Sequence, residues 1–145
     1  MIMLGYLILY LKLANIFLIK LNQIIYISHL HCDHLDPKTL KNCNKNTKIL
    51  IKKFKDERLK KKIINLGFKK IIECDSWKKY KINKDLTIAI IPQISNNSDN
   101  IENNVFYDLD SSIIIYSNID KKVFLNSVDN PLSLKDYKKI NNFVK

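Results

Sequence analysis

The chain has 145 residues, of which 46% are hydrophobic and 27% are charged; this composition excludes an intrinsically disordered protein and suits one domain with a buried core. The formal net charge is +11, but no basic stretch alternates with aromatic residues suited to stacking, so we expect no nucleic-acid partner. The three cysteines include no Cys-x-x-Cys pair, which excludes a disulfide framework and favours a reducing, cytoplasmic location.

The first 23 residues are strongly apolar and form a separate N-terminal segment, 1–23. They lack the basic start and the small-residue cleavage site of a signal peptide. Lys12 and Lys20 interrupt the apolar run before it reaches the roughly 20 residues that a membrane span needs. We expect a helix or strand that covers the core and no membrane association, with a membrane anchor as the alternative.

Strands and helices alternate in the first half of the remaining chain. The pattern predicts strands at 24–28, 47–51 and 69–74, and helices at 37–43 and 55–67. Asp36 is the expected N-cap of the first helix, and Gly67 lies where a C-terminal cap belongs. This order favours α/β layering with a partly parallel sheet.

The second half changes character. Successive strands are predicted at 80–82, 86–91, 111–117 and 121–127, at least some of them in hairpins. A closing helix is predicted at 131–144, with Ser133 as its N-cap. The segment 95–104, "SNNSDNIENN", is predicted to be a polar loop.

All three histidines fall in the string "HLHCDH" directly after the first predicted strand. In an extended backbone His29 and His31 point to the same side and can bind one cation. Asp33 and His34 follow where the chain turns, and they can reach a second cation. Such side chains bind zinc, iron or manganese. The alternative is a set of ordinary histidines, but this spacing favours a metal site; Cys32 should point away from it.

The pattern H-x-H-x-D-H after a strand resembles the metal-binding signature of the metallo-β-lactamase superfamily. The wider run "IYISHLHCDHLDPKTL" and the later "LGFKKIIEC" are similar to one branch of it. That branch contains lactonase-like hydrolases and the corresponding domain of CMP-N-acetylneuraminate hydroxylase. The resemblance covers residues 24–145 and implies an α/β fold, an αβ/βα sandwich with mixed sheets.

The resemblance also implies further ligands. In the superfamily an aspartate at the end of a later strand bridges two metals, and Asp129 in "KKVFLNSVDNPLS" matches that position. The alternative is an ordinary turn aspartate. The family supplies more histidines after the first motif, but none follows His34 here. Asp108 or Asp110 lies about where one of them would be and could replace it.

The same resemblance indicates a partial domain. Family members begin with a strand-rich segment before the histidine motif and continue well beyond the bridging aspartate. Here only 28 residues precede His29 and 16 follow Asp129. We therefore expect a truncated sandwich. Because such a sandwich should expose an apolar face, we also expect either self-association through that face or poor solubility.

Two functions follow from these expectations. The first is a metal-dependent hydrolase in which a metal-activated water attacks an ester, lactone or phosphodiester of a small-molecule substrate. It would hold one or two ions, with zinc expected before iron or manganese, and Asp33 would orient the water. The second is a truncated, inactive remnant or non-catalytic subunit that keeps the motif. Oxygen chemistry like that of the hydroxylase would need a Rieske ligand set, which the sequence lacks.

Overall fold

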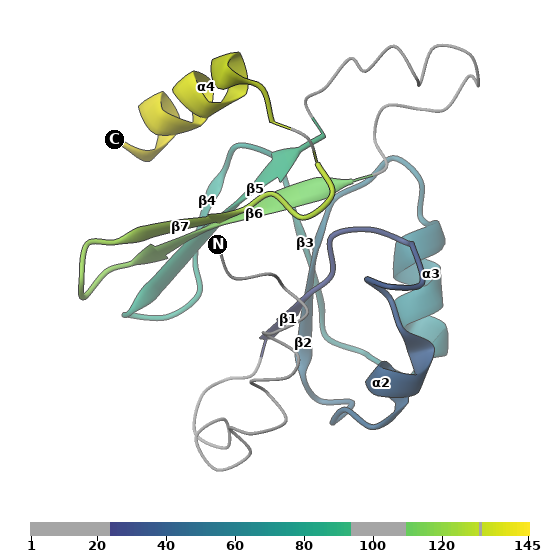
Figure 1. Cartoon of the computed structure of the whole chain (residues 1–145). Coiled ribbons are helices and arrows are strands. Elements are labelled where there is room, and N and C mark those ends of the chain that lie inside the picture. Colours follow the sequence, from purple (N-terminus) through teal and green to yellow (C-terminus); the bar gives the residue numbers. More distant parts are fainter. Residues whose placement is uncertain (1–23, 94–109, 131) are drawn as a thin grey trace, which may run out of the picture.

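The computed structural model of the chain describes residues 24–93, 110–130 and 132–145 (Figure 1). The N-terminal segment 1–23 and the predicted loop at 95–104 lie outside these described residues. Among the helices that the structure describes, none has the length and apolar character needed to cross a membrane.

One sheet is parallel and has the strand order β1-β2-β3. Its strands are β1 (Ile24–Tyr26), β2 (Lys48–Lys52) and β3 (Ile71–Cys74). Two helices connect them, α2 (Pro37–Lys41) and α3 (Arg58–Asn65). This β-α-β-α-β arrangement is the one predicted from the alternation of elements.

The other sheet is antiparallel and has the strand order β4-β5-β6-β7. Its strands are β4 (Lys79–Lys81), β5 (Leu86–Pro92), β6 (Ser111–Ser117) and β7 (Val123–Asn126). The chain ends with α4 (Leu134–Val144). The hairpins predicted for this half are therefore confirmed.

The two sheets face each other, with helices on both outer sides (Figure 1). Alternate residues of a strand point to opposite faces, so Ile49 and Ile51 of β2 pack against α2 and α3, whereas Leu50 points to the other sheet. In the same way, Ile88 and Ile90 of β5 face the parallel sheet. The result is a four-layer αβ/βα sandwich, as the family resemblance implied.

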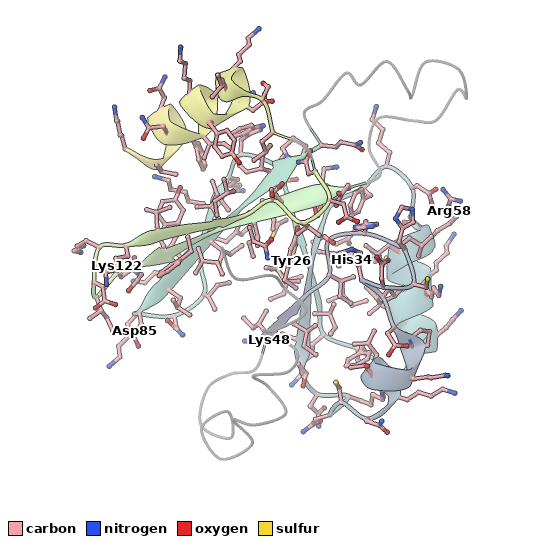
Figure 2. The ribbon with its side chains drawn as sticks, in the orientation of Figure 1. Tyr26, His34, Lys48, Arg58, Asp85 and Lys122 are labelled. Atoms are coloured by element: carbon pink, nitrogen blue, oxygen red, sulfur yellow. The ribbon has the colours of Figure 1, made fainter. Side chains whose placement is uncertain are left out.

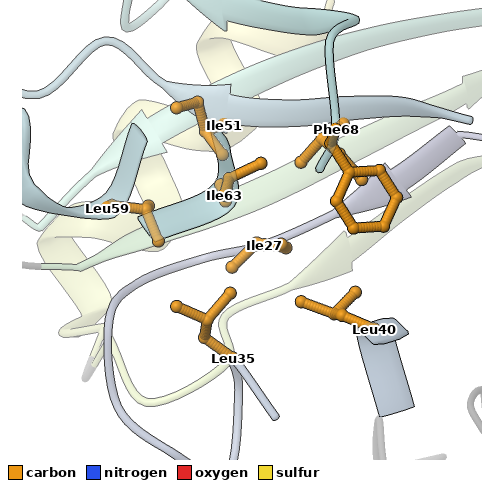
Figure 3. Close-up of a cluster of buried hydrophobic side chains, with 8 residues drawn as sticks. Ile27, Leu35, Leu40, Ile51, Leu59, Ile63 and Phe68 are labelled. Carbon is orange, nitrogen blue, oxygen red and sulfur yellow. The ribbon is translucent and has the colours of Figure 1, made fainter. Parts of the chain in front are cut away.

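The outer core beneath α2 and α3 is fully apolar (Figure 3). Its buried members are Ile27, Leu35, Leu40, Ile49, Ile51, Leu59, Ile63 and Phe68. A smaller cluster of Ala89, Ile91, Ile114 and Ile140 joins the antiparallel sheet to α4. Burial of this kind stabilises the fold by about 25 cal/mol per Å² of apolar surface, and it makes the sheets a rigid support for the loops at their ends.

The predicted helix ends are confirmed. Asp36 accepts hydrogen bonds from the backbone N–H groups of Lys38 and Thr39 at the start of α2. Gly67 has φ +91°, a left-handed conformation that favours glycine after a helix. Ser133 and Asp136 form a capping box at the start of α4.

Candidate metal centre

The histidine motif lies in the loop between β1 and α2. Ile27 extends the pairing with β2 by one backbone hydrogen bond, so the chain leaves the sheet at the carboxyl ends of the parallel strands. His29 follows and is buried. The loop then closes on itself, because the backbone N–H groups of His34 and Leu35 both donate to the carbonyl of His31. Leu35 anchors the loop in the outer core.

The three histidine side chains lie together. Nε2 of His29 is 2.8 Å from Nδ1 of His31. The ring centroids of His29 and His34 are 4.3 Å apart, and Figure 2 shows His34 on the loop beside the parallel sheet. His29 and His34 belong to one group of possible metal ligands, whereas His31 contacts Nε2 of His29 and lies outside that group.

Asp129 joins this cluster from the opposite sheet. It follows β7, and its Oδ2 lies 3.0 Å from Nε2 of His34 and 3.6 Å from Nε2 of His29. One ligand atom each from His29, His34 and Asp129 lies within 4.8 Å of the others, which is close enough to bind one metal ion. The carboxylate thus lies next to both histidines, and its role as a bridging ligand stays a prediction.

Asp33 and Cys32 lie at the rim. The side chain of Asp33 is 71% exposed, and its Oδ2 is 3.4 Å from Nε2 of His34. Asp33 can therefore reach the same volume as His34 while staying open to solvent. Cys32 is exposed, and it does not belong to the ligand group formed by the described residues.

Asp110 lies on the far side of the His29 ring. It is buried directly before β6, and its Oδ1 is 3.1 Å from Nδ1 of His29. The same oxygen accepts a hydrogen bond from the backbone N–H of Ser111. Asp110 therefore contacts the ring nitrogen that faces away from Asp129. This geometry suits a carboxylate that orients a metal-binding histidine better than a substitute ligand; the other candidate, Asp108, lies outside the described residues.

The surroundings of His29 favour its protonated form. Burial by itself lowers the pKa of His29, but the hydrogen bond to Asp110 and the negative charges of Asp110, Asp129 and Asp33 outweigh it. The net result is a pKa above the ordinary value of 6.5. Three carboxylates thus gather around three imidazoles in a chain of net charge +11, and the same negative field attracts a cation.

The residues present fit a divalent cation. Imidazole nitrogens and carboxylate oxygens are ligands of zinc, iron and manganese. Two nitrogens that bind one tetrahedral zinc ion at about 2.0–2.1 Å are about 3.3 Å apart. Separations of 3.0 Å between His34 and Asp129 and 3.6 Å between His29 and Asp129 lie on either side of that value.

Sequence reasoning missed the polar residues that support the cluster. Oγ of Ser28 lies 2.9 Å from Nδ1 of His29, and Asn130 is buried directly after Asp129. Ser112 contacts Asn130 through its hydroxyl group. Each is a small polar residue next to a predicted ligand or strand end, but no local pattern in the sequence reports what such a residue contacts across the fold.

No protein-family model and no curated protein sequence matches the chain. Solved structures do match it. A possible metal-dependent hydrolase from Veillonella parvula DSM 2008 aligns with 81% of this chain at 17% identity and a TM-score of 0.63. The isothiocyanate hydrolase from Delia radicum gut bacteria aligns with 87% at 18% identity and a TM-score of 0.63. CmlA, a diiron β-hydroxylase from Streptomyces venezuelae, aligns with 83% at 16% identity and a TM-score of 0.64.

The matched regions are parts of larger proteins. The chain spans 43% of the Veillonella protein, 47% of the isothiocyanate hydrolase and 23% of CmlA. All three have the metallo-β-lactamase fold. The histidine motif at the end of β1, the αβ/βα layers and these structural matches agree, and they show that this chain has the metallo-β-lactamase fold.

Proposed function

We propose that the chain belongs to a metal-dependent hydrolase and carries its metal-binding residues. One observation supports this most strongly: ring nitrogens of His29 and His34 and the Asp129 carboxylate meet within 4.8 Å, although they come from opposite sheets. Two proteins of the same fold are described as hydrolases, one of them as a possible metal-dependent hydrolase.

In this proposal His29, His34 and Asp129 hold one cation, because their ligand atoms lie within 4.8 Å of one another. His31 lies next to His29, and Asp33 lies next to His34, so these two residues complete that site or hold a second cation. Zinc is the proposed metal; iron and manganese suit the same donors, and one protein of this fold is described as a diiron enzyme. A bound divalent cation supplies a water activated at neutral pH and a positive charge that polarises the substrate.

We assign the remaining roles in the site to Asp110 and Asp33. Asp110 accepts the Nδ1 proton of His29, which leaves the Nε2 lone pair of the neutral ring for a cation. Asp33 is exposed at the rim, where its free carboxylate oxygen orients the attacking water and accepts its proton. We propose a small-molecule ester, lactone or phosphodiester as substrate.

The proposed compartment is the cytoplasm. The three cysteines are free in the structure, and Cys74 is buried between the sheets. Unpaired thiols of this kind are typical of a reducing environment.

A second candidate is a non-catalytic, metal-binding subunit. The observation that favours it is the absence from the whole sequence of any histidine after His34. A site with few imidazoles can hold an ion without activating water efficiently.

The deciding experiment measures metal content by elemental mass spectrometry on the wild type, His31→Ala and Cys32→Ser. The Cys32 variant changes the same loop but removes no proposed ligand. We expect one or two ions per wild-type chain, retention in Cys32→Ser and a sharp loss in His31→Ala. An empty wild type, after metal is supplied during expression, would overturn the proposal.

Turnover separates the two candidates. The metal-loaded protein is assayed with an aryl ester, a simple lactone, an aryl phosphodiester and, in view of the structural match, an isothiocyanate. Hydrolysis that depends on His31 and is reduced in Asp33→Asn supports the hydrolase. Bound metal without turnover of any of these substrates supports the non-catalytic subunit.

A further inference from the structure

Asp129 lies in a strained turn. The backbone N–H of Asn130 donates to the carbonyl of Ser127, which closes a four-residue turn around Val128 and Asp129. Val128 has φ +55°, a left-handed conformation that a β-branched residue rarely adopts. A strained backbone of this kind persists only where the surrounding structure holds it in place.

Asn130 supplies much of that restraint. The residue is 2% exposed, and its Nδ2 donates to the carbonyl of Pro92, 3.1 Å away at the end of β5. The same amide donates to Oγ of Ser112, 2.9 Å away at the start of β6. The two hydrogens of one amide thus tie the turn to two neighbouring strands.

Ser112 also holds the turn, and we call the side-chain hydrogen bonds of Asn130 and Ser112 the clamp. Its fully buried hydroxyl donates to the carbonyl of Ser127 at 3.1 Å while it accepts from Asn130. On the other side of the turn, Oδ1 of Asn126 accepts from the backbone N–H of Val128 at 3.0 Å. The first, second and last residues of the turn are therefore held, and only Asp129 points outward, with its carboxylate towards His34 and His29.

We propose that Asn130 is a positioning residue for Asp129. It acts with Ser112 to hold the strained turn so that the Asp129 carboxylate stays between the two histidines. This inference rests on the proposed metal site, because it explains how that site keeps its ligand from the second sheet.

The physical reason is that three side-chain hydrogen bonds, two from Asn130 and one from Ser112, hold a turn that lacks the regular backbone hydrogen bonds of a helix or strand. Without the Asn130 amide, the buried Ser112 hydroxyl and the Pro92 carbonyl lose a donor, and Val128 can relax towards negative φ. Relaxation of Val128 rotates the following peptide, and the Asp129 carboxylate moves with it. A misplaced carboxylate binds a cation more weakly even though every ligand is still present.

The test compares Asn130→Ala with Ser133→Ala. The control removes the hydroxyl that caps α4 three residues later, so it destabilises the same segment without touching the turn. Affinity for Zn²⁺ is measured by competition with a chelating dye, and the absorption spectrum of bound Co²⁺ reports the ligand geometry. We expect about a 10- to 100-fold weaker affinity and an altered cobalt spectrum for Asn130→Ala, and a change below about threefold for Ser133→Ala.

A double variant separates strain from general damage. Glycine adopts positive φ without steric cost. The turn of the Val128→Gly variant should therefore depend less on the hydrogen bonds of Asn130 and Ser112. Asn130→Ala should therefore reduce affinity less in the Val128→Gly background than in the wild type. If Asn130→Ala and Ser133→Ala weaken binding equally, or if the loss is the same in both backgrounds, Asn130 has no positioning role.

A second readout does not depend on metal. Backbone couplings and chemical shifts of Val128 are measured by NMR in the metal-free wild type and in Asn130→Ala. A wild type that binds no metal overturns the proposed hydrolase, and the clamp is then judged by this readout alone. Loss of positive φ at Val128 in the variant supports the clamp; retention of positive φ overturns it.

Discussion

Asp110 and His29 come from different sheets, yet a carboxylate oxygen of Asp110 lies 3.1 Å from Nδ1 of His29, and both side chains are buried. A carboxylate only accepts hydrogen bonds, so Asp110 favours a proton on Nδ1; when the ring is neutral, Nε2 then keeps the lone pair that a cation needs. The pair therefore fixes which nitrogen of His29 faces His31 and Asp129.

Replacement of this carboxylate should weaken metal binding. In Asp110→Asn the residue keeps its shape but loses its charge and its strict acceptor character, so we expect about 10- to 100-fold lower affinity for Zn²⁺. Asp120→Asn makes the same charge change at an exposed position beyond β6 and should leave affinity within about twofold. Competition with a chelating dye measures both; equal affinities would show that Asp110 does not support the site.

The pH dependence of the metal-free protein should reveal the same pair. The pKa of His29 is raised above 6.5 by Asp110 and the nearby carboxylates, against the opposing effect of burial. Its protonated form therefore contributes stability that is fully present below pH 6.5 and is lost as pH rises through the raised pKa. NMR titration of the ring protons should give a value above 6.5 for His29 and a lower value in Asp110→Asn.

Protons and metal compete for the same ring. Binding requires neutral imidazole, so affinity should fall by about tenfold per pH unit for each proton displaced. Because the pKa of His29 is raised, the fall should begin above pH 6.5. An affinity that stays constant from pH 8 to pH 6 would contradict the assignment of His29 as a ligand.

Tyr26 should contribute to stability by joining the two sheets. Its hydroxyl donates to the backbone carbonyl of Ser111 at 2.8 Å, and Oγ of Ser111 donates in turn to the carbonyl of Ser28. Tyr26→Phe leaves a buried acceptor without this donor, so we expect a loss of about 1–3 kcal/mol in the free energy of unfolding. Tyr137→Phe, at an exposed position on α4, should change it by less than about 0.5 kcal/mol in the same urea titration.

We propose that the chain self-associates through β7. This strand ends the order of the antiparallel sheet in the part of the chain that the structure describes. Phe124 is 58% exposed on it, next to the exposed Val123. Lys122 lies at the turn between β6 and β7, and this end of the hairpin is far from His34 (Figure 2). An exposed edge strand with apolar side chains is a template for pairing with a second copy.

Light scattering checks this proposal. Wild type should form dimers or larger species, and Phe124→Lys should shift them towards monomer. Ile64→Lys, at an exposed apolar position on α3, should have no such effect. A wild type that is monomeric and binds no hydrophobic dye would exclude the proposed interface.

The local structure could be predicted from the sequence because local interactions dictate it. Strand and helix periods, the cap at Asp36, the glycine at 67 and the capping box at Ser133 all depend on residues within a few positions of one another. The histidine motif is likewise local, because spacing alone places His29 and His31 on one side of the chain. The first strand is nevertheless shorter than predicted, since its pairing with β2 ends where the loop begins.

The tertiary structure decided how the second sheet meets the histidines. The register of β5 with β6, in which Pro92 lies opposite Ser111, brings Asp110 to the strand end near His29. The clamp of Asn130 and Ser112 then sets the direction of Asp129. These contacts join residues far apart in the chain, and their distances depend on strand register and on the packing of two sheets. The amino-acid sequence by itself determined the candidate ligands, and only folding determined that Asp110 lies beside Nδ1 of His29 while Asp129 lies on the side of Nε2.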